Sequence, residues 1–156
     1  MSRLAPSMDG QSYGIGDEFW RTTPAYADLD RARFLDPHWQ SRNTIRSIES
    51  LASALGSTLD PDLAKDAAAG QRIAPMALRI TPYIVGLIDW KSARRDPLRR
   101  QFLPLASERE PDHPASQRDS LNEVDDSPVP GLVRRYPDKA LFLPLNTCPV
   151  YCALSG

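Results

Sequence analysis

Apolar residues in the first two thirds of the chain recur at helical spacing, and a capping residue followed by proline precedes most of these periodic stretches. An Asp or Thr side chain can accept a hydrogen bond from a free amide at a helix start, and proline at the first helical position gives up no useful donor. The chain has five such pairs: Thr23-Pro24, Asp36-Pro37, Asp60-Pro61, Thr81-Pro82 and Asp96-Pro97. The pattern therefore predicts up to five helix starts.

The clearest helical pattern follows Asp36-Pro37 and is expected to end at Gly56, a residue type that commonly stops helices. Its face comprises Ser41, Ile45, Ile48, Ala52 and Leu55, with Leu51 beside them. We expect a helical core, built from Ile45, Ile48, Leu51, Leu55, Ile84, Leu87 and Ile88.

Three shorter helices are expected further along the chain. An Ala-rich helix begins at Pro61 and reaches Gly70, and another begins at Pro82 with its aliphatic residues on one side. A basic turn or two over 98–103 is closed by Pro104, because proline cannot continue a helix interior.

The helical pattern stops after Pro104. The stretch 104–138 holds six of the 15 prolines and few apolar side chains, so it is expected to be an extended arm that packs across another surface. The apolar run 140–145 predicts one buried strand, which Pro144 keeps short or at a sheet edge. We expect no pairing partner for this strand within the chain, so a sheet would need more chain or another molecule.

These patterns divide the chain into four parts. Residues 1–16 are expected to be a disordered tail, 17–104 a helical region, 105–139 a Pro-rich arm, and 140–156 a strand with the start of the loop that follows it. The fold class is therefore mainly α.

Composition excludes several function classes. The formal charge is −1, from 19 basic and 20 acidic residues, which gives no general attraction to nucleic acid or anionic lipid. No apolar run approaches the roughly 20 residues that span a bilayer, so no membrane association is expected. The start of the chain lacks the apolar core of a secretory signal, and a cytoplasmic location is the expectation.

The candidate chemistry lies in the last nine residues. Cys148 and Cys152 are spaced as C-x3-C, and a ligand two residues further on would complete C-x3-C-x2-C, in which three thiolates hold a four-iron cluster with one open iron. Ser155 occupies that third position, and a hydroxyl is a poor ligand for iron. An ordinary pair of thiols or a labile disulfide explains the spacing equally well. A zinc site that adds His38 and His113 has the right ligand types but no recognised spacing.

The residues before Cys148 resemble the lysine 2,3-aminomutase family. Residues 126–139 read D-S-P-V-P-G-L-V-R-R-Y-P-D-K and are followed by A-L-F-L and then by C-x2-Y-C. The family reads P-V-P-G-L, a basic or His residue, R-Y-P-D-R, an apolar strand and C-x2-Y-C. This stretch is the most specific element of the resemblance.

Further patches match the family in the same order. Trp39-Gln40 with Asn43 and Ile45 is similar to W-Q-x-x-N-x-I, the stretch 80–83 to I-T-P-Y-Y, and the stretch 96–104 to D-P-I/V-R-x-Q-x-x-P. Asp119, Leu121 and Glu123 echo D-P-L-x-E, with Ser120 in place of proline. The resemblance covers about residues 20–152, nearly the whole chain.

The resemblance implies a fold and a chemistry. The fold would be an N-terminal helical region, an extended Pro-rich arm and the first strand of a truncated radical-enzyme α/β barrel. The family moves an amino group from C2 to C3 of lysine or a related small amino acid. It uses a [4Fe-4S] cluster, S-adenosylmethionine and pyridoxal phosphate, and these cofactors supply the difficult chemistry.

The resemblance also implies site residues, although none is catalytic. Cys148 and Cys152 match the first two cluster ligands, and Arg135 and Tyr136 match the residues that hold the phosphate of pyridoxal phosphate. Lys139 stands where the family has a second Arg, and a lysine offers charge to a phosphate without the fixed fork of arginine.

We expect a truncated or incomplete aminomutase-like protein that is inactive alone, because the pyridoxal lysine and the substrate carboxylates of the family lie beyond Gly156. A homo-oligomer, or docking on a full-length relative, is the expected association. The alternative is a non-catalytic helical module that docks on a partner chain through the arm and the unpaired strand.

Overall fold

The computed structural model describes residues 16–74, 77–111, 114, 122–145 and 148–152. It forms two compact units. The helical unit takes its described residues from Met1–Arg109 and Pro149–Ser155, and the hairpin unit takes them from Glu110–Cys148. The predicted boundaries at 16/17, 104/105 and 139/140 stay predictions, and nearly all of the predicted tail lies outside the described residues.

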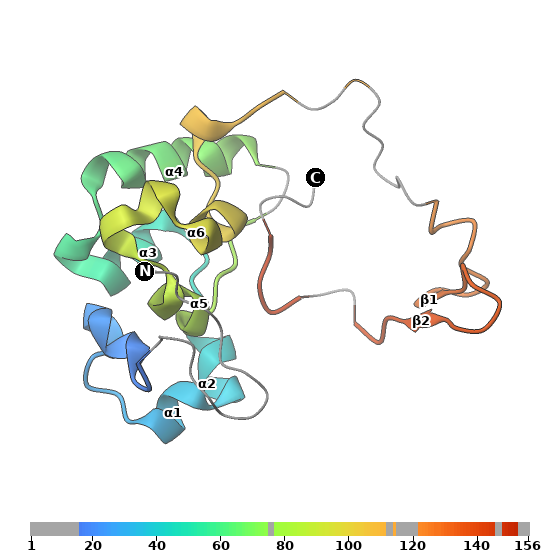
Figure 1. Cartoon of the computed structure of the whole chain (residues 1–156), viewed down its shortest axis with the longest axis horizontal. Helices are drawn as coiled ribbons and strands as arrows, with labels where there is room; N and C mark the ends of the chain where they lie inside the picture. The colour runs from blue at the N-terminus through green and yellow to red at the C-terminus, as the bar shows by residue number, and fades with distance from the viewer. Residues whose placement is uncertain (1–15, 75–76, 112–113, 115–121, 146–147, 153–156) are drawn as a thin grey trace. The chain divides into compact units, whose positions relative to one another are not determined.

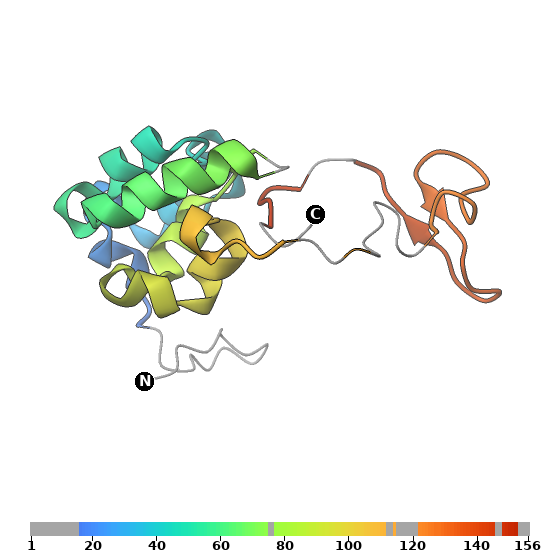
Figure 2. The same ribbon diagram turned by 90° about the horizontal axis from the view of Figure 1, so that it is seen from above.

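The helical unit contains most of the regular structure, which confirms the prediction of a mainly α chain (Figure 1). Its α-helices are α1 (Arg31–Leu35), α2 (Pro37–Arg42), α3 (Ile48–Leu55), α4 (Pro61–Ile73), α5 (Pro82–Leu87) and α6 (Pro97–Phe102). Its 3-10 turns are η1 (Phe19–Thr22), η2 (Pro24–Tyr26), η3 (Gly56–Thr58), η4 (Trp90–Arg95) and η5 (Ala106–Glu108). Helix α4 lies beside α3 (Figure 2). None of the helices in the described part of the chain has the length and apolar character that crossing a bilayer requires.

All five cap–proline pairs open a helix or a 3-10 turn, as predicted, with the proline in its first turn. The three aspartates of these pairs, Asp36, Asp60 and Asp96, accept amide hydrogen bonds from the first turn. The two threonines, Thr23 and Thr81, accept no such bond from the described residues. Proline geometry rather than a side-chain cap therefore marks the threonine starts.

The single long helix expected between Pro37 and Gly56 is wrong. Helix α2 ends at Arg42 and α3 begins at Ile48. Between them Ile45 pairs with Ile80, its N–H donating to the Ile80 carbonyl at 2.8 Å and its carbonyl accepting from the Ile80 N–H at 3.0 Å. Ser47 then starts α3 through reciprocal bonds with Ser50.

Most of the residues predicted to form the core are buried. Ile45, Ile48, Leu51, Leu55 and Ile88 are buried. Helix α5 departs from the prediction, because it buries Val85 and Gly86 while Ile84 and Leu87 are only half-buried. Gly86 lies close to η1, since a Cβ there would lie 3.2 Å from the Phe19 ring and 3.2 Å from the Trp20 Cα, which is tighter than an ordinary van der Waals contact.

An aromatic cluster completes the core at η1 and α1. The rings of Trp20 and Phe34 are stacked with centroids 4.6 Å apart, and the Phe19 ring meets Tyr83 edge-on at 5.0 Å. Trp20 and Phe34 have no exposed surface, and Trp39 packs half-buried against the same cluster. The aromatic cluster therefore extends the core, with Trp20 and Phe34 inside it and the partly buried rings packed against it.

The hairpin unit corrects the prediction for 140–145. Strand β2 (Leu141–Phe142) pairs antiparallel with β1 (Leu132–Val133), so it has a partner within the chain. It is not buried, since Leu141 is 51% and Phe142 69% exposed. Gly131 allows this pairing: its φ is +83°, and a Cβ there would lie 3.0 Å from the Leu143 carbonyl oxygen. A barrel that begins with this strand, and an arm packed on another surface, stay predictions.

Candidate functional site

The segment 149–152, which contains the second predicted cluster ligand, lies on the helical unit and is held there by Arg79. The Tyr151 N–H donates to the Arg79 carbonyl at 3.0 Å, and the Arg79 Nε donates to the Pro149 carbonyl at 3.3 Å. The Arg79 guanidinium also lies 5.4 Å from the centroid of the Tyr151 ring, within cation–π distance. We refer to these three contacts as the Arg79 clasp.

The clasp is continuous with the core. Ile80, the next residue after Arg79, is the one that pairs with Ile45 through two backbone hydrogen bonds. Ile80 has no exposed surface, so its position is fixed by packing as well as by hydrogen bonds. The backbone of Arg79 is therefore anchored, and the Tyr151 amide is bound to an anchored carbonyl.

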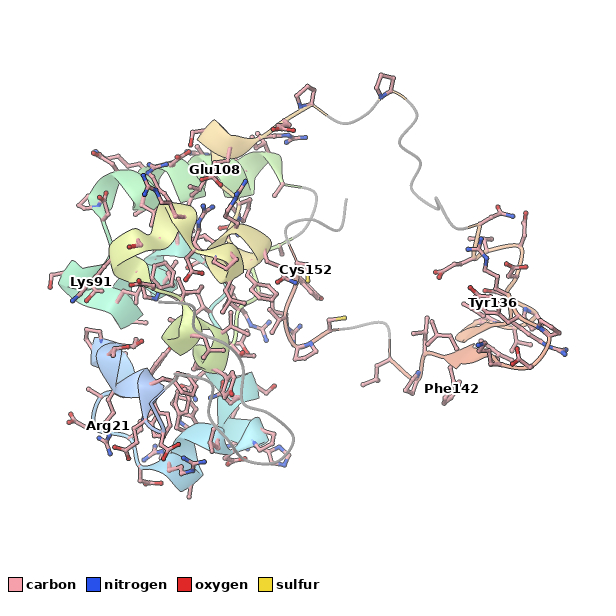
Figure 3. The ribbon with its side chains drawn as sticks, in the orientation of Figure 1. Arg21, Lys91, Glu108, Tyr136, Phe142 and Cys152 are labelled. Atoms are coloured by element: carbon pink, nitrogen blue, oxygen red, sulfur yellow. The ribbon has the colours of Figure 1, made fainter. Side chains whose placement is uncertain are left out.

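Cys152 follows directly after this anchored backbone and is half-buried (Figure 3). The Gln101 Nε2 donates to the Cys152 Sγ at 3.7 Å, a normal distance for a hydrogen bond to sulfur. Cys148 belongs to the hairpin unit and is exposed, and neither cysteine forms a disulfide. The labile disulfide is therefore not the state of this structure, and joint binding of one metal site by the two sulfurs stays a prediction.

Helix α6, which carries Gln101, is fixed by a buried arginine. Arg99 is 1% exposed and donates to the carbonyls of Ala93 at 2.8 Å and Arg94 at 2.7 Å. Both terminal nitrogens of Arg99 also donate to the Glu108 carboxylate, each at 2.8 Å. Residues two apart on a helix point to different sides. Arg99 therefore anchors α6 from inside while Gln101 reaches Cys152.

Glu108 is itself positioned by a second polar cluster. Ser107, its neighbour in η5, donates to Asp66 of α4 through its backbone N–H at 2.9 Å and through its hydroxyl. Arg94 donates to the same carboxylate at 3.0 Å. The hydrogen bond from the Ser107 hydroxyl is the main cause that lowers the pKa of Asp66 below its ordinary value. The ionised carboxylate thus ties η5 to α4.

The predicted phosphate-binding residues lie together on the loop between β1 and β2. Arg135, Tyr136 and Lys139 are all exposed. The Lys139 Nζ lies 5.2 Å from the centroid of the Tyr136 ring. The loop is held by Arg134, whose N–H donates to the Asp126 carbonyl at 2.8 Å. Two cations and a phenol on one exposed loop fit a phosphate in charge and in hydrogen-bonding capacity.

The described residues do not bring together a complete set of metal ligands. Among the described residues, no group of three or more His, Cys, Asp or Glu side chains could hold a metal ion. Ser155 and His113 lie outside the described residues, and His38 is exposed in the first turn of α2. The two thiols fit an iron–sulfur cluster in kind, since thiolates are its usual ligands.

Comparison with known proteins gives relatives of one kind. No family model matches the chain. The L-lysine 2,3-aminomutase of Bacillus subtilis is 36% identical over 137 residues, which is 85% of this chain and 27% of the relative. The enzyme of the same name from Clostridium subterminale is 36% identical over 81% of this chain and 29% of its own length. That of Acetoanaerobium sticklandii is 39% identical over 81% of this chain and 29% of its own length.

These matches confirm the resemblance found in the motifs. The chain spans less than a third of the length of the curated relatives it matches. Sequence analysis predicted a cluster-ligand role for the two cysteines and a phosphate-binding role for the basic loop, but no role for Gln101 or Arg79. Gln101 belongs to the matched stretch 96–104, which was the one available signal for it.

Proposed function

Because the chain belongs to the L-lysine 2,3-aminomutase family, we propose that it is the N-terminal part of a radical S-adenosylmethionine aminomutase. The reaction would be the migration of an amino group from C2 to C3 of lysine or a related amino acid. This part would supply two cysteine ligands of a [4Fe-4S] cluster and the phosphate contacts of pyridoxal phosphate. The observation that carries the proposal is the C-x2-Y-C segment, whose Tyr151 and Cys152 are held on the helical unit by the Arg79 clasp and Gln101.

The residues of this chain bind and orient, and the cofactors would supply radical formation and amino-group migration. Cys148 and Cys152 would ligate iron as thiolates. The Arg135 guanidinium would hold the coenzyme phosphate with paired hydrogen bonds, and Tyr136 would add a hydroxyl. Lys139 would contribute a point charge, because an ammonium lacks the planar fork of a guanidinium.

Anaerobic reconstitution with iron and sulfide tests the metal site. We expect iron uptake with the broad visible absorbance of an iron–sulfur cluster, and loss of both in Cys148→Ser and Cys152→Ser. Ser155→Cys completes C-x3-C-x2-C and should raise the iron content toward about four per chain, whereas the control Ser155→Ala should not. Absence of iron from both the native chain and Ser155→Cys would overturn the proposal.

Titration with pyridoxal phosphate tests the basic loop. Arg135→Gln removes hydrogen bonds to a charged group and should weaken binding by about 1.5–3 kcal/mol, roughly 10- to 100-fold. Lys139→Arg restores the residue type of the family and should tighten binding. Lys91→Gln, a charge-matched change at an exposed lysine of the other unit, serves as the control. Equal affinities for all four proteins would exclude this loop as the phosphate site.

A second candidate function is docking of the hairpin unit on a full-length relative. The observation that favours it is the exposure of large apolar side chains there, including Phe142 at 69% and Leu145 at 77%. A two-stranded hairpin is marginally stable alone in water, so a covering surface would stabilise it. Relatives carry more than two thirds of their length beyond the region that this chain matches. A complex with a full-length L-lysine 2,3-aminomutase that Phe142→Ser abolishes, together with no iron uptake, would favour this function over the first.

A further inference from the structure

Helix α6 carries Gln101, whose side chain contacts the sulfur of Cys152, a predicted cluster ligand. The Asp96 carboxylate accepts from the Arg99 N–H at 2.9 Å and fixes the first turn of α6, while the Arg99 side chain fixes the helix to η4 and η5. Gln101 is half-buried on this short helix, and its Nε2 lies 3.7 Å from the Cys152 Sγ. An amide donor on a fixed helix therefore points at a sulfur 51 residues further along the chain.

We propose that Gln101 is a positioning residue for Cys152: its side-chain amide holds the Sγ by a hydrogen bond and raises the reduction potential of the cluster that this sulfur ligates. The proposal rests on the proposed function for the cluster itself. Hydrogen bonds to ligand sulfurs stabilise the reduced cluster, because reduction places additional negative charge on the sulfurs, and they are one of the terms that set cluster potentials.

The Arg79 clasp and Gln101 act on different parts of the same segment. The clasp holds the backbone at Pro149 and Tyr151, and Gln101 holds only the side chain of Cys152. Loss of Arg79 should therefore loosen the backbone, whereas loss of the Gln101 donor should change the surroundings of the sulfur and leave the backbone in place. This difference separates a positioning role for Gln101 from a general role in packing.

The first arm of the test uses the metal-free chain. The side-chain amide resonance of Gln101, assigned by ¹⁵N NMR, should shift in Cys152→Ala and stay in place in Cys148→Ala. Hydrogen exchange of the Tyr151 amide should be unchanged in Gln101→Leu and about fivefold faster in Arg79→Met, which loses one hydrogen bond. An unchanged Gln101 chemical shift in Cys152→Ala would overturn the contact, whether or not the chain binds iron.

The second arm uses the reconstituted chain. Gln101→Leu, which is close in size but lacks the donor, should keep the iron content of the native chain and show a more negative midpoint potential in a redox titration. Gln101→Glu, of the same shape with an acceptor in place of the donor, should shift the potential further in the same direction. Gln71→Leu on α4 is the matched control and should leave it unchanged.

The outcomes of the two arms are distinguishable. A potential that is equal in Gln101→Leu and the native chain would overturn the proposal for Gln101 while the cluster stands. A native chain that binds no iron, alone and as Ser155→Cys, would overturn the proposed function and the redox role of Gln101 with it. The NMR arm would in that case still decide whether the amide holds the sulfur.

Discussion

Removal of the Glu108 carboxylate should destabilise the helical unit strongly, because it would leave the Arg99 guanidinium buried without its counter-ion. The side chain of Arg99 is 1% exposed and that of Glu108 is 30% exposed, and two hydrogen bonds of 2.8 Å join them. Breaking a buried ion pair by removing one partner costs about 3–5 kcal/mol. Partial exposure of Glu108 places the expected cost of Glu108→Ala near the lower end, about 3 kcal/mol.

Removal of the arginine instead of the carboxylate should cost a similar free energy of unfolding for a different reason. Arg99→Met removes the charge but leaves the carbonyls of Ala93, Arg94 and Leu103 without their guanidinium donors, at about 1 kcal/mol each. In the double variant the unpaired charge is absent, so its cost should fall short of the sum of the single variants by about 2 kcal/mol.

Urea unfolding followed by circular dichroism measures all three variants against a matched control. Arg100 also approaches Glu108, at 3.8 Å, but its side chain is 66% exposed, so Arg100→Met should change the free energy of unfolding by less than about 0.5 kcal/mol. A Glu108→Ala variant as stable as Arg100→Met, or a double variant whose cost is the plain sum, would refute the idea that a buried pair fixes α6.

Three further changes test other parts of the fold. Gly70→Ala should lower the melting temperature despite the better helix propensity of Ala, because its Cβ would lie 2.5 Å from the Pro104 carbonyl oxygen; a higher melting temperature would contradict this packing. Burial raises the pKa of Tyr26 to about 12 from 10.0, so its contribution to stability is present below pH 10 and is lost as the pH rises to 12; Tyr26→Phe should unfold at higher pH in an alkaline titration. The lowered pKa of Asp66 contributes stability above its ordinary value of 3.8 that is lost as the pH falls through the folded value, so Asp66→Asn should make the acid limb of the stability curve shallower than in the native chain.

Local signals in the sequence predicted the helix starts and little of what joins them. An Asp-Pro or Thr-Pro pair acts within one turn, so all five starts could be found from adjacent residues. Ile45 fits the apolar face of a continuous helix, yet its backbone pairs with Ile80, 35 residues away, and this pairing breaks the helix. Periodicity contains no information about such a distant partner.

The strand prediction failed for a related reason. A run that is apolar on both faces is typical of a strand buried in a parallel sheet, so 140–145 was expected to be buried and unpaired. The partner strand, Leu132–Val133, has only two residues, and it lies, with the Gly131 turn before it, within the stretch predicted to be an extended arm. The side chains of β2 are exposed in the structure, so the described residues of its own unit do not bury this apolar run.

The basic residues at 99–100 show how one motif can contain two roles. By composition alone the stretch 98–103 is a solvated basic turn, and Arg100 is indeed exposed. Arg99 differs because its guanidinium donates to three backbone carbonyls and to Glu108. The residue type alone does not predict this buried environment.

Two motif stretches that are far apart in the sequence, 96–104 and 149–152, contact each other within the helical unit. The stretch 96–104 carries an aspartate that starts α6, an arginine that anchors it inside, and Gln101, which reaches the sulfur of Cys152. The stretch 148–152 carries Tyr151, whose backbone amide is bound to the Arg79 carbonyl. A helical unit held together in this way would hold a cluster ligand in place before iron arrives, so the entropy of ordering that ligand is spent in folding rather than in metal binding. Variants that loosen α6, such as Glu108→Ala, should therefore weaken iron uptake as well as stability.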